Sequence, residues 1–336
     1  MRVNIYDVAY RAGVSVVTVS RVINNVPTVR ERNKQKVLKA MKELNYEPNA
    51  AARALARGKS GVIGLLTPSL EDAFFGKAIE AIHRYLMDQG YFLALSITGC
   101  DYKNEFDIRN THLFTQDRVD GIILLTPMFE EILVPDLKKA SIPYVLIDNQ
   151  DTSSSGTSVL IDNYTGAYEA VNHLAGLGHK DIVHICGLEE YLSSQERKKG
   201  YLEAVRDKGL PKYPVYKGEF SVESGYRCTK QIFSDGLKPT AIFAADDVTA
   251  FGVMQALSEM NLSAPEHVSV VGFDDHPLSR QLKPYLTTVC QSEEDLARRA
   301  VEELINAIEG KEKRSTTIRI RPQLIVREST GPCLVS

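Results

Sequence analysis

Acidic side chains cluster at two places in the second half of the chain. The pair Asp246-Asp247 and the triplet Asp274-Asp275-His276 each follow a short apolar run. Paired carboxyl groups beside a histidine could bind a metal ion or perform general acid–base chemistry. The sequence lacks, however, a glycine-rich phosphate loop, a Gly-x-Ser-x-Gly motif and a His/Cys cluster with metal-ligand spacing. We therefore expect no enzyme, no metal and no cofactor, and keep an enzyme that uses these acids as a remote alternative.

The positive charge of the chain is concentrated at its start. Residues 1–60 contain twelve Lys or Arg and four Asp or Glu, a net charge of +8. The whole chain carries −3, so the other 276 residues carry −11. A basic segment joined to an acidic body fits a polyanionic partner for that segment alone.

The basic segment has the pattern of a helix-turn-helix. Two short amphipathic helices are expected at residues 5–12 and 16–23, capped by Asn4 and Ser15, and a third at residues 32–44. Their core residues recur at spacings of three and four: Val8, Val14, Val19, Ile23, Val37, Met41 and Leu44. On the opposite face of the second helix stand Val16, Val17, Ser20 and Arg21, which are free to enter a major groove.

The rest of the chain divides into a linker and a body. An alanine-rich segment follows Pro48, and at about nine residues its helix is too short to be stable without a partner. From Gly61 onward, apolar runs alternate with helical patterns, as in βαβ units. We expect strands at residues 62–66, 92–95, 121–125, 144–147, 158–161, 182–185, 241–244 and 269–273. The predicted fold is an all-α head and hinge helix followed by two α/β lobes with doubly wound parallel sheets.

The sequence shows none of the patterns that are typical of an exported or membrane protein. The five cysteines are scattered singly, no apolar run is long enough to span a membrane, and the first residues lack the apolar core of a signal peptide. We expect a reduced, cytoplasmic protein with no membrane contact. A transport-type binding protein would have the same body but would need a signal peptide.

Several segments resemble the signature of the LacI/GalR family of bacterial transcription regulators. They include Tyr6-Asp7-Val8-Ala9, Ala12-Gly13-Val14-Ser15, residues 18–24 and 44–49, Leu177-Gly178-His179, Gln195-Glu196-Arg197 and Gly272-Phe273-Asp274-Asp275. The resemblance implies a cytoplasmic, nucleoid-associated homodimer on a pseudo-palindromic DNA operator. It also implies a body like a periplasmic sugar-binding protein, whose cleft holds a small effector that controls the hinge helices.

The resemblance divides the chain into three parts. Residues 1–46 form the DNA-binding head, residues 47–60 the hinge helix and linker, and residues 61–336 the effector-binding and dimerisation core. In that core the N-lobe spans about 61–161 plus 290–320, and the C-lobe about 162–289 plus 321–330. The ten residues from Arg327 to Ser336, with Gly331-Pro332 among them, cannot form a heptad extension, so a dimer is expected.

The resemblance also assigns DNA contacts. Val16 and Val17 meet bases, and because both are apolar they favour thymine methyl groups, whereas Arg21 can bind guanine. The remaining contacts are Ser20 in the major groove, Tyr6, Arg30 and Asn33 at phosphates, and Asn49, Ala52, Arg53 and Leu55 in the minor groove. Leu55 is the expected wedge at the operator centre. Arg30 departs from the family, whose third helix usually begins with a Ser or Thr cap; it could reach a phosphate instead.

The same comparison places effector contacts at the carboxyl ends of strands. They are Phe74, Phe75, Asp148, Arg197, Phe220, Asp246 and Asp274. Many relatives have Asn where this chain has Asp246, so the cleft offers several acceptors against one cation. We expect a neutral sugar or polyol whose binding releases the repressor from DNA. The alternative is a regulator whose DNA binding is strengthened by a purine corepressor or a partner protein.

Overall fold

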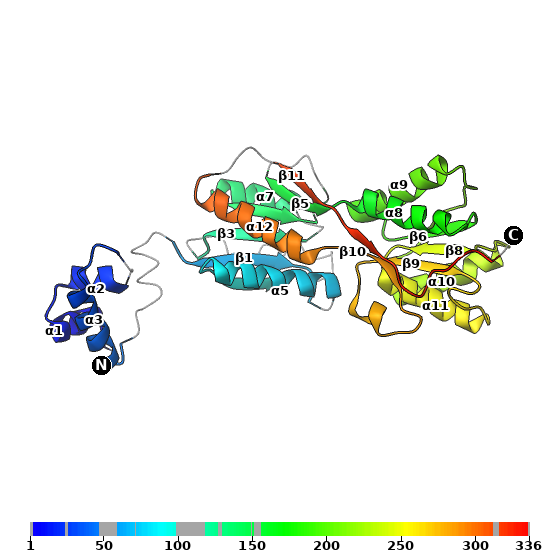
Figure 1. Cartoon of the computed structure of the whole chain (residues 1–336). Helices are drawn as coiled ribbons and strands as arrows, with labels where there is room; N and C mark the ends of the chain where they lie inside the picture. Colours follow the sequence, from blue (N-terminus) through cyan, green and yellow to red (C-terminus); the bar gives the residue numbers. More distant parts are fainter. Residues whose placement is uncertain are drawn as a thin grey trace. The chain divides into compact units, whose positions relative to one another are not determined.

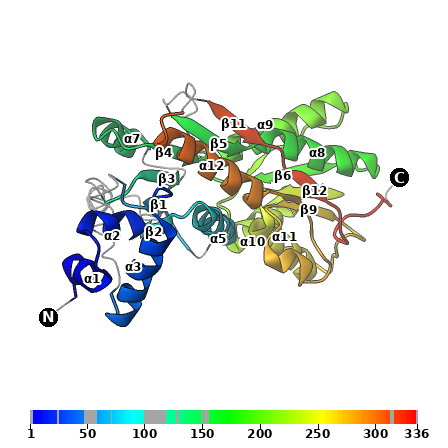
Figure 2. The same cartoon turned by 60° about the vertical axis from the view of Figure 1, so that its left-hand side comes forward.

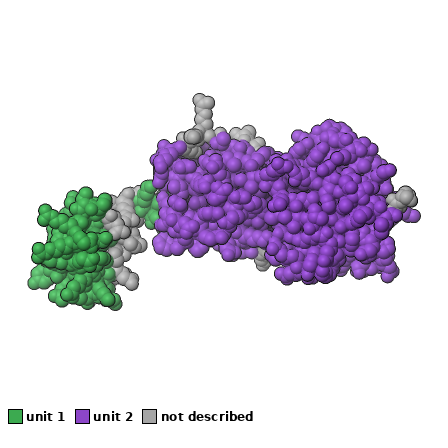
Figure 3. Space-filling view, in the orientation of Figure 1, with its two compact units in different colours: residues 1–61, 117–120 green, residues 62–116, 121–336 purple. Residues whose placement is uncertain are grey.

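The computed structural model describes residues 3–23, 26–46, 59–70, 72–98, 118–126, 130–148, 150, 156–311 and 316–334. The chain forms two compact units (Figure 3). One comprises residues 1–61 with 117–120, and the other residues 62–116 with 121–336. The first unit contains the helical head and the second contains the body.

The head consists of α1 (Ile5–Ala12), α2 (Val16–Ile23) and α3 (Glu31–Glu43). The side chain of Asn4 accepts hydrogen bonds from the backbone of Tyr6 and Asp7, at 2.8 and 3.2 Å, and Asp7 accepts one from the Asn4 backbone at 2.8 Å. Ser15 Oγ accepts a bond from the Thr18 amide at 3.2 Å, at the start of α2. Both expected caps are therefore confirmed. Arg30 precedes α3 without a side-chain capping bond.

The head core contains the seven expected residues, four of them only partly buried. Val8, Val19 and Val37 are fully buried, as expected. Val22, which was not expected in the core, is more deeply buried than its neighbour Ile23, which packs against the core like Val14, Met41 and Leu44. Two adjacent apolar residues on a helix lie about 100° apart, so the spacing alone did not distinguish them.

The body contains two six-stranded sheets. The first has the order β11-β5-β4-β3-β1-β2 and is parallel throughout the described pairs. Its strands are β1 (Val62–Thr67), β2 (Phe92–Ile97), β3 (Gly121–Leu125), β4 (Tyr144–Ile147), β5 (Thr157–Ile161) and β11 (Thr317–Ile320). All five residues of β3 and of β5 are buried, which explains why these strands are nearly continuous apolar runs in the sequence.

The second sheet has the order β12-β10-β9-β8-β6-β7. Its strands are β6 (Ile182–Cys186), β7 (Tyr216–Lys217), β8 (Ala241–Ala244), β9 (Ser269–Phe273), β10 (Thr287–Cys290) and β12 (Gln323–Ile325). All described pairs are parallel except β10 with β12. The predicted two-lobed fold is confirmed, with an antiparallel edge strand that was not expected.

Helices cover both sheets. On the first lobe α5 (Ala73–Asp88) packs against α12 (Glu293–Ile308), and α7 (Glu130–Lys139) precedes β4. On the second lobe α8 (Asn163–Gly176) and α9 (Leu192–Asp207) lie on one face of the sheet. On its other face lie α10 (Val222–Ser234) and α11 (Asp247–Glu259), as Figures 1 and 2 both show. Among the described residues, no helix is long and apolar enough to cross a membrane.

The chain passes between the two sheets three times. It leaves the first sheet after β5, returns between β10 and α12, and leaves again between β11 and β12. Each lobe is therefore built from separate parts of the sequence. Arg319 of β11 adds a tie between the lobes, since it donates two hydrogen bonds to Glu196 of α9, at 2.7 and 3.0 Å.

Candidate functional site

A cavity of about 270 Å³ lies between the two lobes. Its lining residues follow the carboxyl ends of β1 and β4 in the first sheet and of β6 to β10 in the second. Parallel α/β sheets place binding residues at this edge because the loops after the strands converge there. All seven side chains expected to contact an effector line this cavity: Phe74, Phe75, Asp148, Arg197, Phe220, Asp246 and Asp274.

Arg197 is the only cationic residue among those that line the cavity. It projects from α9 and is 5% exposed. Its guanidinium donates to the Asn163 side chain at 2.9 Å and to the Ala245 carbonyl oxygen at 2.6 Å, and it lies 3.7 Å from the centre of the Phe273 ring. Its third nitrogen is 3.4 Å from Asp274 Oδ1. These contacts fix the guanidinium plane before any ligand enters.

Burial raises the pKa of three carboxyl groups that line the cavity. Burial raises the pKa of Asp148 to about 7, although Arg197 opposes the shift. Burial also raises the pKa of Asp246 and, well above its ordinary value, that of Asp274. Asp246 caps α11, where its Oδ1 accepts a bond from the Thr249 amide at 2.8 Å. Removing these groups from water disfavours the ionised form more than one arginine can compensate.

Aromatic rings form the apolar walls of the cavity. Phe74 and Phe75, at the start of α5, meet edge to face with 5.5 Å between ring centres. On the C-lobe side, Tyr191 and Phe220 stack with 5.9 Å between centres and 21° between planes. Such rings favour ligands with a flat apolar face.

The sequence pattern missed several lining residues. Asp72, Tyr191, Ser193, Glu219 and Gln291 also line the cavity. Asp72 could have been found as the cap of α5, where it accepts a bond from the Phe74 amide at 2.8 Å. Gln291 donates to Asp274, and this contact depends on the crossing of the chain between lobes, which leaves no local signal. Asp148, Phe220 and Asp274 adopt positive φ angles of 55°, 54° and 106°, a conformation that is unusual outside glycine and concentrates at functional sites.

The outer face of α2 presents the expected DNA contacts unevenly. Val17 is 60% exposed and Arg21 is also exposed. Val16, expected on the same free face, is half-buried and packs against the head core, and Ser20 is half-buried too. The structure thus corrects the placement of Val16, which sits at the first turn of α2, where the helix meets the core.

The expected phosphate contacts lie on α1 and around α3. Tyr6 is 70% exposed, Arg30 is exposed and Asn33 is half-buried. The expected minor-groove contacts, Asn49, Ala52, Arg53 and Leu55, lie outside the described residues.

Comparisons with known proteins agree with both parts of this architecture. The model for bacterial regulatory proteins of the lacI family matches residues 4–49, and the model for a periplasmic binding protein-like domain matches residues 171–330. The chain is 37% identical to the HTH-type transcriptional repressor PurR of Pectobacterium carotovorum, over 98% of each chain. This chain belongs to the LacI family.

Solved structures of LacI-family proteins share its fold. The lac repressor dimer bound to operator and the anti-inducer ONPF aligns with a TM-score of 0.88 and 29% identity, over 98% of this chain and all of that one. The complex of the transcriptional regulator CelR with cellobiose aligns with a TM-score of 0.73 and 28% identity, again over 98% and all. This LacI-family chain is a transcriptional repressor with a DNA-binding head and an effector-binding body.

The acids that prompted the enzyme alternative divide between two places in this LacI-family body. Asp247 accepts bonds from the His276 amide at 2.7 Å, Ser279 Oγ at 2.5 Å and Thr288 Oγ1 at 2.5 Å. Asp275 accepts bonds from Arg280 and Arg327. Asp247 and Asp275 therefore stabilise the loop after β9, whereas Asp246 and Asp274 line the cavity.

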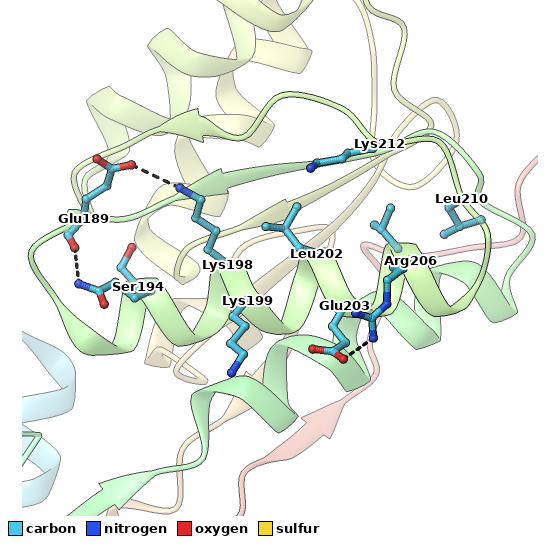
Figure 4. Close-up of a pocket in the computed structure, with 11 residues that line it drawn as sticks. Glu189, Ser194, Lys198, Lys199, Leu202, Glu203, Arg206, Leu210 and Lys212 are labelled. Carbon is cyan, nitrogen blue, oxygen red and sulfur yellow. Dashed lines mark hydrogen bonds and ion pairs between the residues drawn. The ribbon is translucent and has the colours of Figure 1, made fainter. Parts of the chain in front are cut away.

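A second, larger hollow of about 760 Å³ lies along α9 (Figure 4). Leu202 and Leu210 form part of its apolar wall. Most of its charged groups pair with each other: Lys198 lies 3.4 Å from Glu189, and Arg206 contacts Glu203. The lining of this hollow comes from α9 and its two flanking loops alone, whereas both lobes line the inter-lobe cavity, which is therefore the better candidate for the effector site.

Proposed function

We propose that this repressor binds a pseudo-palindromic operator as a homodimer and that a small neutral sugar or polyol in the inter-lobe cavity releases it. The observation that carries the proposal is the convergence of seven effector-type side chains from both lobes on one cavity. A ligand that contacts both lobes binds some arrangements of the lobes more tightly than others and so shifts the population among them. We propose that this shift in lobe arrangement changes the affinity of the head for its operator.

The proposed DNA contacts follow from exposure and chemistry. Val17 offers an apolar surface to a thymine methyl group, and Arg21, one turn later, offers two parallel donors to guanine. Val16 contributes only the part of its side chain that the head core leaves free. Tyr6, Arg30 and Asn33 position the head on phosphates, and residues 47–60, with Leu55 as the wedge, bind the minor groove.

The preference for a neutral, hydroxyl-rich effector rests on the charges of the cavity. Asp148, Asp246 and Asp274 are hydrogen-bond acceptors when ionised, and Arg197 is already engaged by Asn163, Ala245 and Asp274. Where these carboxyl groups are ionised, a phosphate or a sugar acid would bring a second negative charge next to them and would lose Coulombic energy. The CelR complex, which holds cellobiose, supports a sugar on the same fold.

A purine corepressor is the second candidate, and the aromatic walls favour it. Phe74, Tyr191 and Phe220 could stack on a planar base, and carboxyl groups could accept its N–H donors. The relative at 37% identity is a repressor named PurR. In this case the ligand would strengthen operator binding.

One experiment separates the two candidates. The full-length protein is melted alone and with D-glucose, myo-inositol, cellobiose, glucose 6-phosphate, adenine and guanine, and its operator affinity is measured under each condition. A bound ligand raises the melting temperature by mass action. A shift with a neutral sugar or polyol and weaker operator binding supports the proposal. A shift with a purine and tighter operator binding supports the second candidate, and a strong shift with the phosphate contradicts the charge argument.

The variant Asp246→Asn tests which group sets the preference. Asn retains the cap of α11 through its oxygen and adds donors to the cavity. We expect the affinity for the neutral ligand to change and the discrimination against glucose 6-phosphate to weaken. Equal discrimination in both proteins would exclude Asp246 as its source.

A further inference from the structure

The ring of Phe220 occupies a position that only glycine at residue 187 permits. Gly187 follows β6 directly and is buried. A Cβ atom added there would stand 2.1 Å from Phe220 Cζ and 2.4 Å from both Cε atoms. Atoms at such distances overlap, so any other residue at 187 would force the Phe220 ring to move.

The backbone of Phe220 also indicates a constrained position. Its φ angle is +54°, in the left-handed region that residues with a Cβ seldom adopt. Such conformations persist only where the surroundings determine them. The seat at Gly187 and the neighbouring Tyr191 ring, stacked at 5.9 Å, supply those surroundings.

These three residues come from two loops of the C-lobe, because Gly187 and Tyr191 lie at the two ends of the loop between β6 and α9. Gly187 follows β6, Tyr191 precedes α9, and Phe220 lies between β7 and α10. Tyr191 and Phe220 both line the inter-lobe cavity, whereas Gly187 is not among its lining residues. Gly187 therefore acts on a ligand indirectly, through the Phe220 ring that packs against it and through its own loop, which carries Tyr191.

We propose that Gly187 is the positioning residue of the aromatic wall and, through Phe220 and Tyr191, determines which ring-shaped ligands the cavity accepts. The proposal rests on the proposed function, because it takes the cavity as the effector site. The wall fits a ligand with a flat apolar face, either the C–H face of a sugar or polyol ring or the face of a base. A linear ligand gains nothing from such a wall.

A tryptophan reporter makes the wall observable in the full-length protein. The sequence contains no Trp, so Tyr191→Trp provides a single fluorophore beside Phe220. Addition of Gly187→Ala should displace the Phe220 ring, shift the emission maximum and lower the melting temperature by a few degrees. Gly176→Ala is the matched control, because a Cβ there meets no atom within 4 Å. It should leave the emission unchanged.

A double variant tests that the effect passes through Phe220. In a Phe220→Ala background the clash is gone, so Gly187→Ala should cause no further loss of melting temperature. An equal loss in both backgrounds, or an unchanged emission maximum in the first, would overturn the positioning role. This comparison needs no ligand. It contrasts Gly187→Ala in the wild-type background, where the new Cβ overlaps the Phe220 ring, with Gly187→Ala in the Phe220→Ala background, where that ring is absent.

Ligand binding tests the specificity role. D-glucose, myo-inositol and adenine are the probes, and thermal shifts of the wild type show which of them binds. Gly187→Ala should lower the binding affinity for that probe by about tenfold or more. In the Phe220→Ala background the same substitution should lower the affinity no further. An unchanged affinity would contradict the specificity role. If no probe binds the wild type, the proposed small-molecule control fails together with the specificity role, while the melting comparison still decides the positioning role.

Discussion

The head and the inter-lobe cavity differ in how far their expected binding residues are exposed and already bonded within the protein. Val17 and Arg21 are exposed on α2. Arg197 of the cavity is 5% exposed, and its guanidinium already contacts three oxygen atoms of the protein. Val17 and Arg21 lie outside the head core, so changes to these two expected DNA contacts should leave the stability of the head largely unchanged, unlike changes to Val16, which packs against the core. In the cavity, Arg197 belongs both to the packed structure and to the proposed effector site, so a change there should affect both stability and effector binding.

The largest effect should come from Arg197→Met. The change leaves Asp274 and the other cavity carboxyl groups without their cation, and removing one partner of a buried pair costs about 3–5 kcal/mol. Chemical denaturation should show this loss in the body, together with loss of effector binding. Arg206→Met on the same helix is the control, because its side chain is 69% exposed and its loss should cost within about 0.5 kcal/mol. Equal costs for the two variants would break the comparison.

Operator binding should respond to Arg21→Ala without a loss of stability. Removal of a bidentate contact to guanine should weaken binding by about 1–3 kcal/mol, at one base-pair position. The free energy of unfolding should stay within about 0.5 kcal/mol of the wild type, since Arg21 is exposed. Titration of operator variants measures the effect, with Arg32→Ala as the control. A loss that is uniform across operator sequences would assign Arg21 to a phosphate instead.

The contributions of Asp148 and Asp247 to the stability of the body should fall as the pH rises from 4 to 7, whereas His184, whose pKa burial lowers to about 4, contributes in the opposite sense. Burial raises the pKa of Asp148 and of Asp247 from 3.8 to about 7. Between these values the native state keeps protons that the unfolded chain has lost, so the free energy of unfolding decreases with pH. The free energy of unfolding of the wild type relative to Asp148→Asn should therefore decrease by about 1–3 kcal/mol over this range. Denaturation at pH 4.5, 6 and 8 tests this, and an unchanged slope in the variant would exclude Asp148 as a source.

The smallest effect should be a gain from Arg30→Ser. Ser can cap α3, which has no side-chain capping bond, and a new cap is worth about 0.5–1 kcal/mol. If Arg30 contacts a phosphate, the same change should weaken operator binding and reduce its salt dependence. The melting temperature of the head should therefore rise, while the affinity for the operator and its dependence on salt should fall. A loss of head stability would show that the start of α3 depends on Arg30.

Local signals in the sequence predicted the head better than the cavity. Caps such as Asn4 and Ser15 act within three residues, so the helices and their starts could be placed from the sequence. The buried strands could also be placed, because a strand covered on both faces is apolar throughout. The exceptions were β7, with two residues, and the short strands β10, β11 and β12, whose pairing depends on the crossings between lobes.

The cavity needed contacts between distant residues. Its seven expected residues came with the family resemblance, not from periodicity. Gln291 donates to Asp274, 17 positions away, and Gly187 seats a ring that lies 33 positions later in the chain. No pattern within a single segment encodes such a contact, since it arises only when the loops converge. Val16 shows the same limit on a smaller scale, because its contact with the head core follows from packing of the helices.

The three passages of the chain between the sheets also set an order of events during synthesis on the ribosome. The first lobe receives its covering helix α12 and its edge strand β11 only after the strands β6 to β10 of the second lobe have been made. The second lobe, in turn, receives β12 last. During synthesis, both lobes therefore remain incomplete, with apolar surface exposed, until α12, β11 and β12 have been made. We expect a nascent protein that stalls before residue 293 to bind chaperones.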